Sequence, residues 1–162
     1  MTGTTLHEVL EHHPFAEELS PHHLERLSAM AEQARFETDE VIFREGDECS
    51  KFYLIASGRV ALEIVAPGRI FRVQTLEAGD ELGWSAMLMR SGKHFQARAL
   101  EPVAALAFEG SELLRVSKDD LALGFALMYR MLGVVSARLQ ATRLQLLDIY
   151  SPKVKKAGAP GG

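Results

Sequence analysis

Four glycine-containing turns recur every ten to twelve residues in the middle of the chain, and this spacing restricts the fold more than any other feature. The glycines are Gly46, Gly58, Gly68 and Gly79. Short runs rich in β-branched and aromatic residues lie around these turns. The runs are residue 36 and residues 41–43, 52–55, 60–65, 70–73, 95–99 and 104–108. Evenly spaced short strands predict a roll, jelly roll or sandwich, because the gaps hold no helical pattern of the kind a parallel βαβ sheet needs.

Helical patterns flank the strands. Apolar residues recur at helical spacing over residues 6–12 and 20–33. Ser20 followed by Pro21 predicts an N-cap with proline at the first helical position. The expected fold class is therefore mainly β with α, a jelly roll with short N-terminal helices and a long C-terminal helix.

At the C-terminal side, Ser111 can cap a short helix to residue 116, and Asp119 or Asp120 begins a much longer helix. The long helix carries seven positions that alternate four and three residues apart, which is an a/d seam of three heptads. They are Met128, Leu132, Val135, Leu139, Thr142, Leu146 and Ile149. A helix that simply packs on the roll also shows an apolar stripe, but Leu127, Met131, Leu144 and Leu147 widen this one, which favours a homodimer.

The composition is that of one ordinary globular domain. The chain has 162 residues, 22 acidic and 18 basic side chains and a net charge of -4. It therefore lacks the positive field of a general nucleic-acid binder. Its single cysteine cannot form an intrachain disulfide, and residues 1–13 lack a signal-peptide pattern, so a cytoplasmic location is expected. No apolar run is expected to reach the ~18 residues of a membrane span.

Residues 1–150 are expected to form one domain, with strands over about 35–109 and helices over about 111–150. Residues 151–162, with three lysines and a Pro-Gly-Gly end, are predicted to be disordered. No catalytic motif occurs, so an enzyme is not expected. Five of the six histidines precede the first strand without zinc-site spacing, so no metal site is predicted.

Three segments in this order resemble the cyclic nucleotide-binding domain family, as found in the sensor half of Crp/Fnr-type regulators. The segments are residues 42–47 (IFREGD), 52–60 (FYLIASGRV) and 79–83 (GDELG), followed by 97–101 (ARALE). The resemblance covers about residues 14–150. It implies a β-roll that binds a small ligand and signals through its C-terminal helices.

In the family, the ligand lies beside a short helix that follows the Gly-Asp turn and presents backbone N–H groups to a cyclic phosphate. The resemblance therefore predicts a ligand-binding set in two segments. The set is Leu82, Gly83, Trp84, Ser85, Ala86, Lys93, His94 and Phe95. Ser85 is also interpreted as a cap of that short helix.

The chain departs from the family pattern at two positions. The family has Glu after the glycine, where it accepts hydrogen bonds from the ribose, and this chain has Trp84. The family has Arg at the phosphate, and the matching residues here are Lys93 or His94. Each lost hydrogen bond to a charged group is worth about 1.5 to 3 kcal/mol, so cyclic nucleotide binding is expected to weaken on the order of a hundredfold to ten-thousandfold.

These features leave two interpretations of Trp84 open: a wall for a less polar ligand, or a side chain that fills a vacant pocket. The first predicts a ligand-sensing regulatory domain, for a cyclic nucleotide or another small anionic or apolar ligand. The second predicts a degenerate domain that serves as a dimerisation or protein-interaction module. Too few residues follow Ile149 for a helix-turn-helix, so direct DNA binding is not expected. Arg98 is expected to be a surface strand residue.

Overall fold

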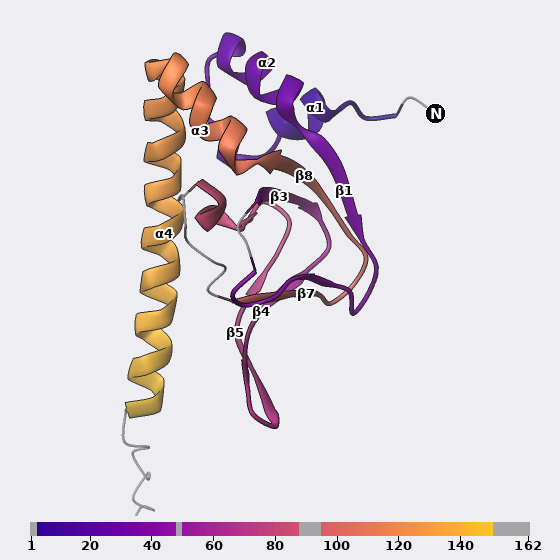
Figure 1. Cartoon of the computed structure of the whole chain (residues 1–162), viewed down its shortest axis with the longest axis vertical. Coiled ribbons are helices and arrows are strands. Elements are labelled where there is room, and N and C mark those ends of the chain that lie inside the picture. The colour runs from indigo at the N-terminus through magenta and orange to yellow at the C-terminus, as the bar shows by residue number, and fades with distance from the viewer. Residues whose placement is uncertain (1–2, 48–49, 88–94, 151–162) are drawn as a thin grey trace, which may run out of the picture.

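The computed structural model describes residues 3–47, 50–87 and 95–150 and contains two antiparallel sheets that form a jelly roll (Figure 1). The first sheet has the order β1 (Glu32–Phe36), β8 (Val103–Glu109), β3 (Lys51–Ser57) and β6 (Glu81–Leu82). The second has the order β2 (Val41–Phe43), β7 (Gln96–Ala99), β4 (Val60–Ala66) and β5 (Arg69–Leu76). The predicted fold class is confirmed. The expected strands are present, and β6 is an addition, because a two-residue strand carries no readable period.

The predicted turns follow from backbone conformation. Gly58, between β3 and β4, has a φ of +90°, and a Cβ there would lie 2.4 Å from the carbonyl oxygen of Pro102. Both the dihedral and the close approach require glycine. The turn therefore carries the chain from β3 in the first sheet to β4 in the second.

Two apolar clusters hold the molecule together. One fills the roll between the sheets and includes Ile55, Val60, Leu62, Leu76 and Leu82. The other lies between the first sheet and the helices. It includes Leu10, Phe15, Leu27, Phe52, Leu106, Phe108, Leu113, Leu123 and Leu127. The helical cluster makes the N-terminal and C-terminal helices parts of one core.

The N-terminal helices are α1 (Leu6–Glu11), the 3₁₀ turn η1 (Pro14–Ala16) and α2 (Pro21–Met30). Ser20 caps α2 by accepting a hydrogen bond from the His23 N–H at 3.2 Å, as predicted. The prediction that this helix reaches residue 33 is wrong. Ala31 is extended, and Glu32 already pairs with Ala107 of β8. Pairing with the sheet outweighs helix propensity at Glu32 and Gln33.

The C-terminal helices are α3 (Gly110–Asp119) and α4 (Leu121–Tyr150). The predicted Ser111 cap is wrong, since α3 begins one residue earlier and Glu109 makes no side-chain cap. Gly110 packs so closely on η2 (Trp84–Met87) that a Cβ would lie 2.0 Å from the Ala86 carbonyl oxygen. This contact fixes the start of α3.

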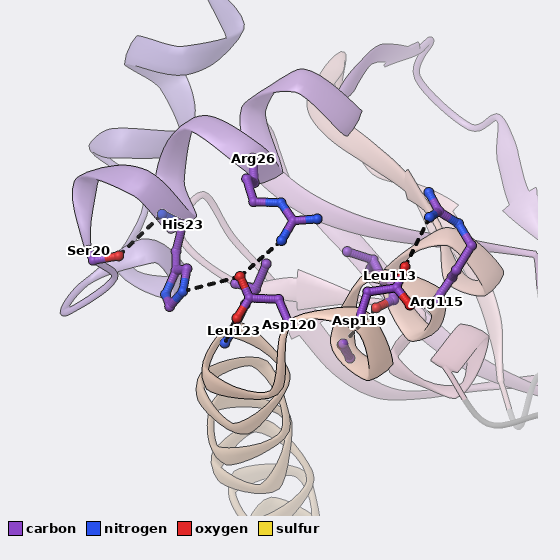
Figure 2. A network of polar contacts seen from close by, with 9 residues as sticks. Ser20, His23, Arg26, Leu113, Arg115, Asp119, Asp120 and Leu123 are labelled. Carbon is purple, nitrogen blue, oxygen red and sulfur yellow. Dashed lines mark hydrogen bonds and ion pairs between the residues drawn. The ribbon is translucent and has the colours of Figure 1, made fainter.

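Asp120 separates α3 from α4 and binds both α4 and α2 (Figure 2). Its Oδ1 accepts a hydrogen bond from the Leu123 N–H at 3.1 Å, which confirms Asp120 as the residue that begins the long helix. Its Oδ2 lies 2.9 Å from Arg26 Nη1 and 3.6 Å from His23 Nε2. The hydrogen bond from Leu123, followed by the Arg26 and His23 contacts, lowers the pKa of this carboxyl. The α3–α4 junction is thereby fastened to α2.

One face of α4 packs on the domain and another does not. Leu123, Leu127, Met131 and Val134 are buried, whereas the seam positions are mostly exposed. Relative exposure is 42% at Met128, 67% at Leu132, 69% at Leu139, 50% at Leu146 and 74% at Ile149. The interpretation in which the seam packs on its own roll therefore does not hold. The homodimer remains a prediction.

The expectation that no apolar run reaches the length of a membrane span is wrong. By length and composition, α4 could cross a membrane, with a mean hydropathy of 1.3 over its most apolar 18-residue window. One helix of this kind is weak support for insertion, because an apolar helix of a soluble domain passes the same test. The buried face of α4 already packs on the helical cluster.

Candidate ligand site

A small cavity lies inside the roll, next to the end of the segment 79–83. Asp80 leads into β6, whose residues pair with Tyr53 and Leu54 of β3. Gly83 follows with a φ of +79°, which glycine adopts without strain. The chain then turns into η2, and the Ala86 N–H donates to the Gly83 carbonyl at 2.9 Å.

Five of the eight predicted ligand-binding residues line this cavity. They are Leu82, Gly83, Trp84, Ser85 and Phe95. Phe43, Leu62 and Arg138 are the other described residues in the lining, and the sequence did not predict them. Among the described lining residues, most are apolar and Arg138 is the one cation.

Of the other three predicted residues, one faces away from the cavity and two fall where the structure gives no description. Ala86 is 8% exposed and belongs to the helical cluster, on the side of η2 that faces Gly110. It was assigned to the site by its place in the motif, but the 3₁₀ turn rotates it away. Lys93 and His94 lie outside the described residues, so their predicted role at the ligand stays untested.

Two residues of η2 differ in their surroundings. Ser85 is 4% exposed and lies second in η2, so its predicted role as the cap that precedes the helix is wrong. Trp84 lines the cavity and also packs, partly buried, against the helical cluster. The indole thus touches both the cavity and the core on which α3 and α4 rest.

Arg138 reaches the cavity from α4. Its Nη1 donates to Gln74 Oε1 of β5 at 3.3 Å, and its Nη2 donates to the backbone carbonyl of Glu81 in β6. Burial lowers the pKa of this guanidinium, and the nearby Glu81 and Asp80 carboxylates oppose that shift. The guanidinium keeps its charge, because arginine is not deprotonated in proteins.

Glu81 supplies a negative group beside Arg138. Burial raises the pKa of its carboxyl, and Asp80 adds to the effect, while Arg138 and Arg130 work against it. Arg138 is thus held by a side-chain amide and a backbone carbonyl. An anionic ligand would have to compete with both contacts.

Arg98 lies apart from this site. Its Nε donates to Glu63 Oε1 at 3.0 Å, and Gln96 Nε2 donates to the same oxygen at 3.1 Å. Glu63 is only 6% exposed, so the pair satisfies a buried carboxylate across β4 and β7. Arg98 lies in β7 as expected, but its side chain is only 28% exposed and pairs with a buried carboxylate, so the expectation of a surface residue holds only in part.

The cavity volume is about 20 Å³, which is room for about one water molecule. Ligand sites usually occupy about 300–1,000 Å³. A nucleotide-sized guest therefore requires the movement of Trp84, Phe95 or Arg138. Within residues 3–47, 50–87 and 95–150, no group of three or more His, Cys, Asp and Glu side chains could hold a metal ion.

A family model for the cyclic nucleotide-binding domain matches residues 33–120, which is more than half of the chain. The chain belongs to this family. The match includes the strands of the roll from β2 to β8, the cavity-lining segment of β6 and η2, and α3. Arg138 lies beyond it. No curated protein sequence matches the chain.

Solved structures agree with this assignment. A putative cyclic nucleotide-binding protein from Geobacter metallireducens GS-15 is 27% identical, with a TM-score of 0.73, and the match covers 86% of this chain and 99% of that one. A cyclic nucleotide-binding domain from Methylobacillus flagellatus KT is 18% identical, with a TM-score of 0.78, covering 93% and 85%. The c-di-GMP responsive regulator CLP of Xanthomonas campestris is 19% identical, with a TM-score of 0.71, covering 82% and 66%. The last two show the shared fold alone.

Proposed function

We propose that the chain is a non-enzymatic ligand-sensing regulatory domain whose ligand binds beside Gly83 and carries an anionic group. The observation that carries this proposal is the convergence of Arg138 from α4 with the Leu82–Ser85 segment on one cavity. The apolar walls suit a flat, weakly polar body, and the guanidinium suits a phosphate or carboxylate. A cyclic nucleotide or another small anionic ligand fits this description.

The mechanism follows from the two attachments of α4. Near its start, α4 is fastened to α2 through Asp120, and farther along it is fastened to β5 and β6 through Arg138. A ligand that bonds Arg138 replaces its contacts with Gln74 and Glu81, so the position of α4 changes relative to the roll. Ligand binding thereby shifts the population between two arrangements of α4, in proportion to the difference in affinity.

The output surface in this proposal is the exposed seam of α4, from Met128 to Leu146 and on to Ile149. An exposed apolar stripe of this length is costly in water and is covered by a second copy in a homodimer. Regulation then acts on the geometry or stability of a homodimer in the cytoplasm. DNA contact, if it belongs to the pathway, is made by another protein or segment.

The second candidate is an interaction module that retains the fold but binds no small ligand. The observation that favours it is the volume of about 20 Å³, together with Trp84 at the position of the family's Glu. In this case the seam of α4 is the functional surface, and the roll only supports it. The same homodimer is expected, without dependence on a ligand.

The intrinsic fluorescence of Trp84, the only tryptophan, separates the two candidates. We expect a saturable change on titration with cyclic AMP or cyclic GMP, because the indole lines the cavity. No change for either nucleotide up to millimolar concentration contradicts cyclic nucleotide sensing. Native mass spectrometry of protein purified from its own host then tests for a different bound ligand. If the titration shows no change and the mass spectrum shows no bound ligand, the interaction module is the function supported.

A further inference from the structure

Two adjoining grooves at the helical end of the molecule are independent of the cavity. One, of about 680 Å³, lies along α1, η1 and α2, and the other, of about 240 Å³, lies between the η1–α2 loop and α4. Both include Glu17, Glu18 and Leu19 in their lining, so they form one continuous acidic groove. Figure 1 shows these helices and the start of α4 at the end opposite the β4–β5 hairpin.

The acidic groove has an aromatic end. Phe125 and Tyr129 line it from α4, and their rings stack with centroids 6.1 Å apart and an interplanar angle of 22°. They are 73% and 66% exposed. Two large aromatic side chains left in water beside a groove are typical anchors of a protein-binding surface.

The rim of the groove is negative. Glu11, Glu17, Glu18 and Glu25 line it, and all four are exposed. Among the described lining residues, Arg130 is the single Lys or Arg, and it is already engaged: it donates to the Glu17 carbonyl and lies 3.6 Å from Glu18. The remaining negative charge selects a positively charged occupant.

We infer that this groove docks a basic segment of a partner protein, with Lys or Arg side chains on the glutamates and an apolar residue against Phe125 and Tyr129. A second copy of this chain fits less well. In a two-fold symmetric contact both partners use the same surface, so this negative groove would meet a second negative groove. Like charges brought together disfavour such a pair.

The test is selection of binders from a random peptide library displayed against the full-length protein. We expect enriched peptides with a net positive charge around one or two apolar residues. Their affinity should fall about tenfold in the double variant Glu17→Gln, Glu18→Gln, because charged and aromatic contacts carry much of the binding at such surfaces. Phe125→Ser should weaken the same peptides to a similar degree.

The matched control is Glu45→Gln, Glu77→Gln, which removes the same charge from two exposed positions outside the groove. This control should bind the selected peptides like the wild type, and thermal melting should show all variants folded. Neutral or acidic peptides, an absence of enrichment, or equal losses in both double variants would overturn the inference. Binding that emerges only after removal of residues 151–162 would also overturn it, since the chain's own lysines would then be the occupant. None of these outcomes depends on a small ligand in the cavity.

Discussion

Arg138 and Trp84 are the two residues on which the ligand site depends. Trp84 was found from the sequence because the Gly-Asp motif fixes its position. Arg138 could not be found in that way, because its contact with the cavity depends on the rotation of α4 about its axis, which tertiary packing sets. The one available signal in the sequence was the position of Arg138 between the seam residues Val135 and Leu139. An arginine on the solvent-exposed surface of the helix gives the same pattern.

Replacement of Arg138 by Ala should open the cavity to solvent. The change removes the hydrogen bonds to Gln74 and the Glu81 carbonyl, at a cost of about 1–3 kcal/mol in the free energy of unfolding. Acrylamide quenching of Trp84 should increase in the absence of any ligand. The control is Arg130→Ala, which removes an arginine on the same helix that also donates to a backbone carbonyl, away from the cavity. Equal quenching in wild type and Arg138→Ala would show that the guanidinium does not close the site.

His13 is a second residue whose role follows from its contacts. It is 5% exposed, its Nε2 lies 3.1 Å from the Ile55 carbonyl, and its Nδ1 accepts from the Phe15 N–H at 3.1 Å. Only neutral imidazole can donate at Nε2 and accept at Nδ1. Burial, partly opposed by the Ile55 and Asp80 contacts, lowers its pKa below 6.5. The histidine-rich start of the chain therefore includes one residue with a structural role.

The lowered pKa of His13 predicts the direction of a pH effect. Below pH 6.5 the unfolded chain binds a proton that the folded chain does not, so stability is full above that pH and is lost as the pH falls toward the folded pKa. Urea unfolding between pH 7.5 and pH 5 should show a smaller decline for His13→Gln, which starts roughly 1 kcal/mol less stable. His12→Gln, which changes an exposed neighbour, should keep the wild-type slope. Identical slopes in wild type and His13→Gln would contradict this assignment.

At the scale of the elements, the spacing of apolar residues and of glycine turns predicted the strands of the roll. Tertiary contacts decided where individual helices begin and end. The glycine turns located the strands because positive φ values are needed there whatever the surroundings. The end of α2 and the start of α3 were misplaced, since pairing of Glu32 with β8 and contact of Gly110 with Ala86 come from distant parts of the chain. The buried face of α4, which includes Leu123 and Val134, was not predicted, and the predicted seam lies mostly exposed on another face.

The double variant Val135→Glu, Leu139→Glu should convert a dimer to a monomer in analytical ultracentrifugation. Two carboxylates placed at successive seam positions would meet their copies in an apolar interface, and each unpaired buried charge is strongly unfavourable. The matched control is Ala137→Glu, Gln140→Glu, which adds the same charge at exposed positions off the seam. A wild-type protein that sediments as a monomer would refute the dimer, as would a double variant that remains dimeric.

For the whole molecule, α4 connects three surfaces. Its start is bound to α2 through Asp120, its middle reaches the cavity through Arg138, and Gln145 donates to the Val73 carbonyl near its far end. The fold could be predicted from the sequence because many weak local signals agree along the chain. The contacts that join α4 to α2, to the cavity and to β5 could not be predicted, because each is a single contact between residues far apart in sequence.

The central claim is that occupation of the cavity and the position of α4 are linked. Hydrogen–deuterium exchange with and without cyclic AMP or cyclic GMP tests it most directly, since it reports on both segments in one experiment. We predict that a bound nucleotide changes exchange over β6 and η2 and, at the same time, over the turns of α4 around Arg138. Changes confined to β6 and η2 would contradict the linkage, and unchanged exchange in both segments would contradict nucleotide sensing itself.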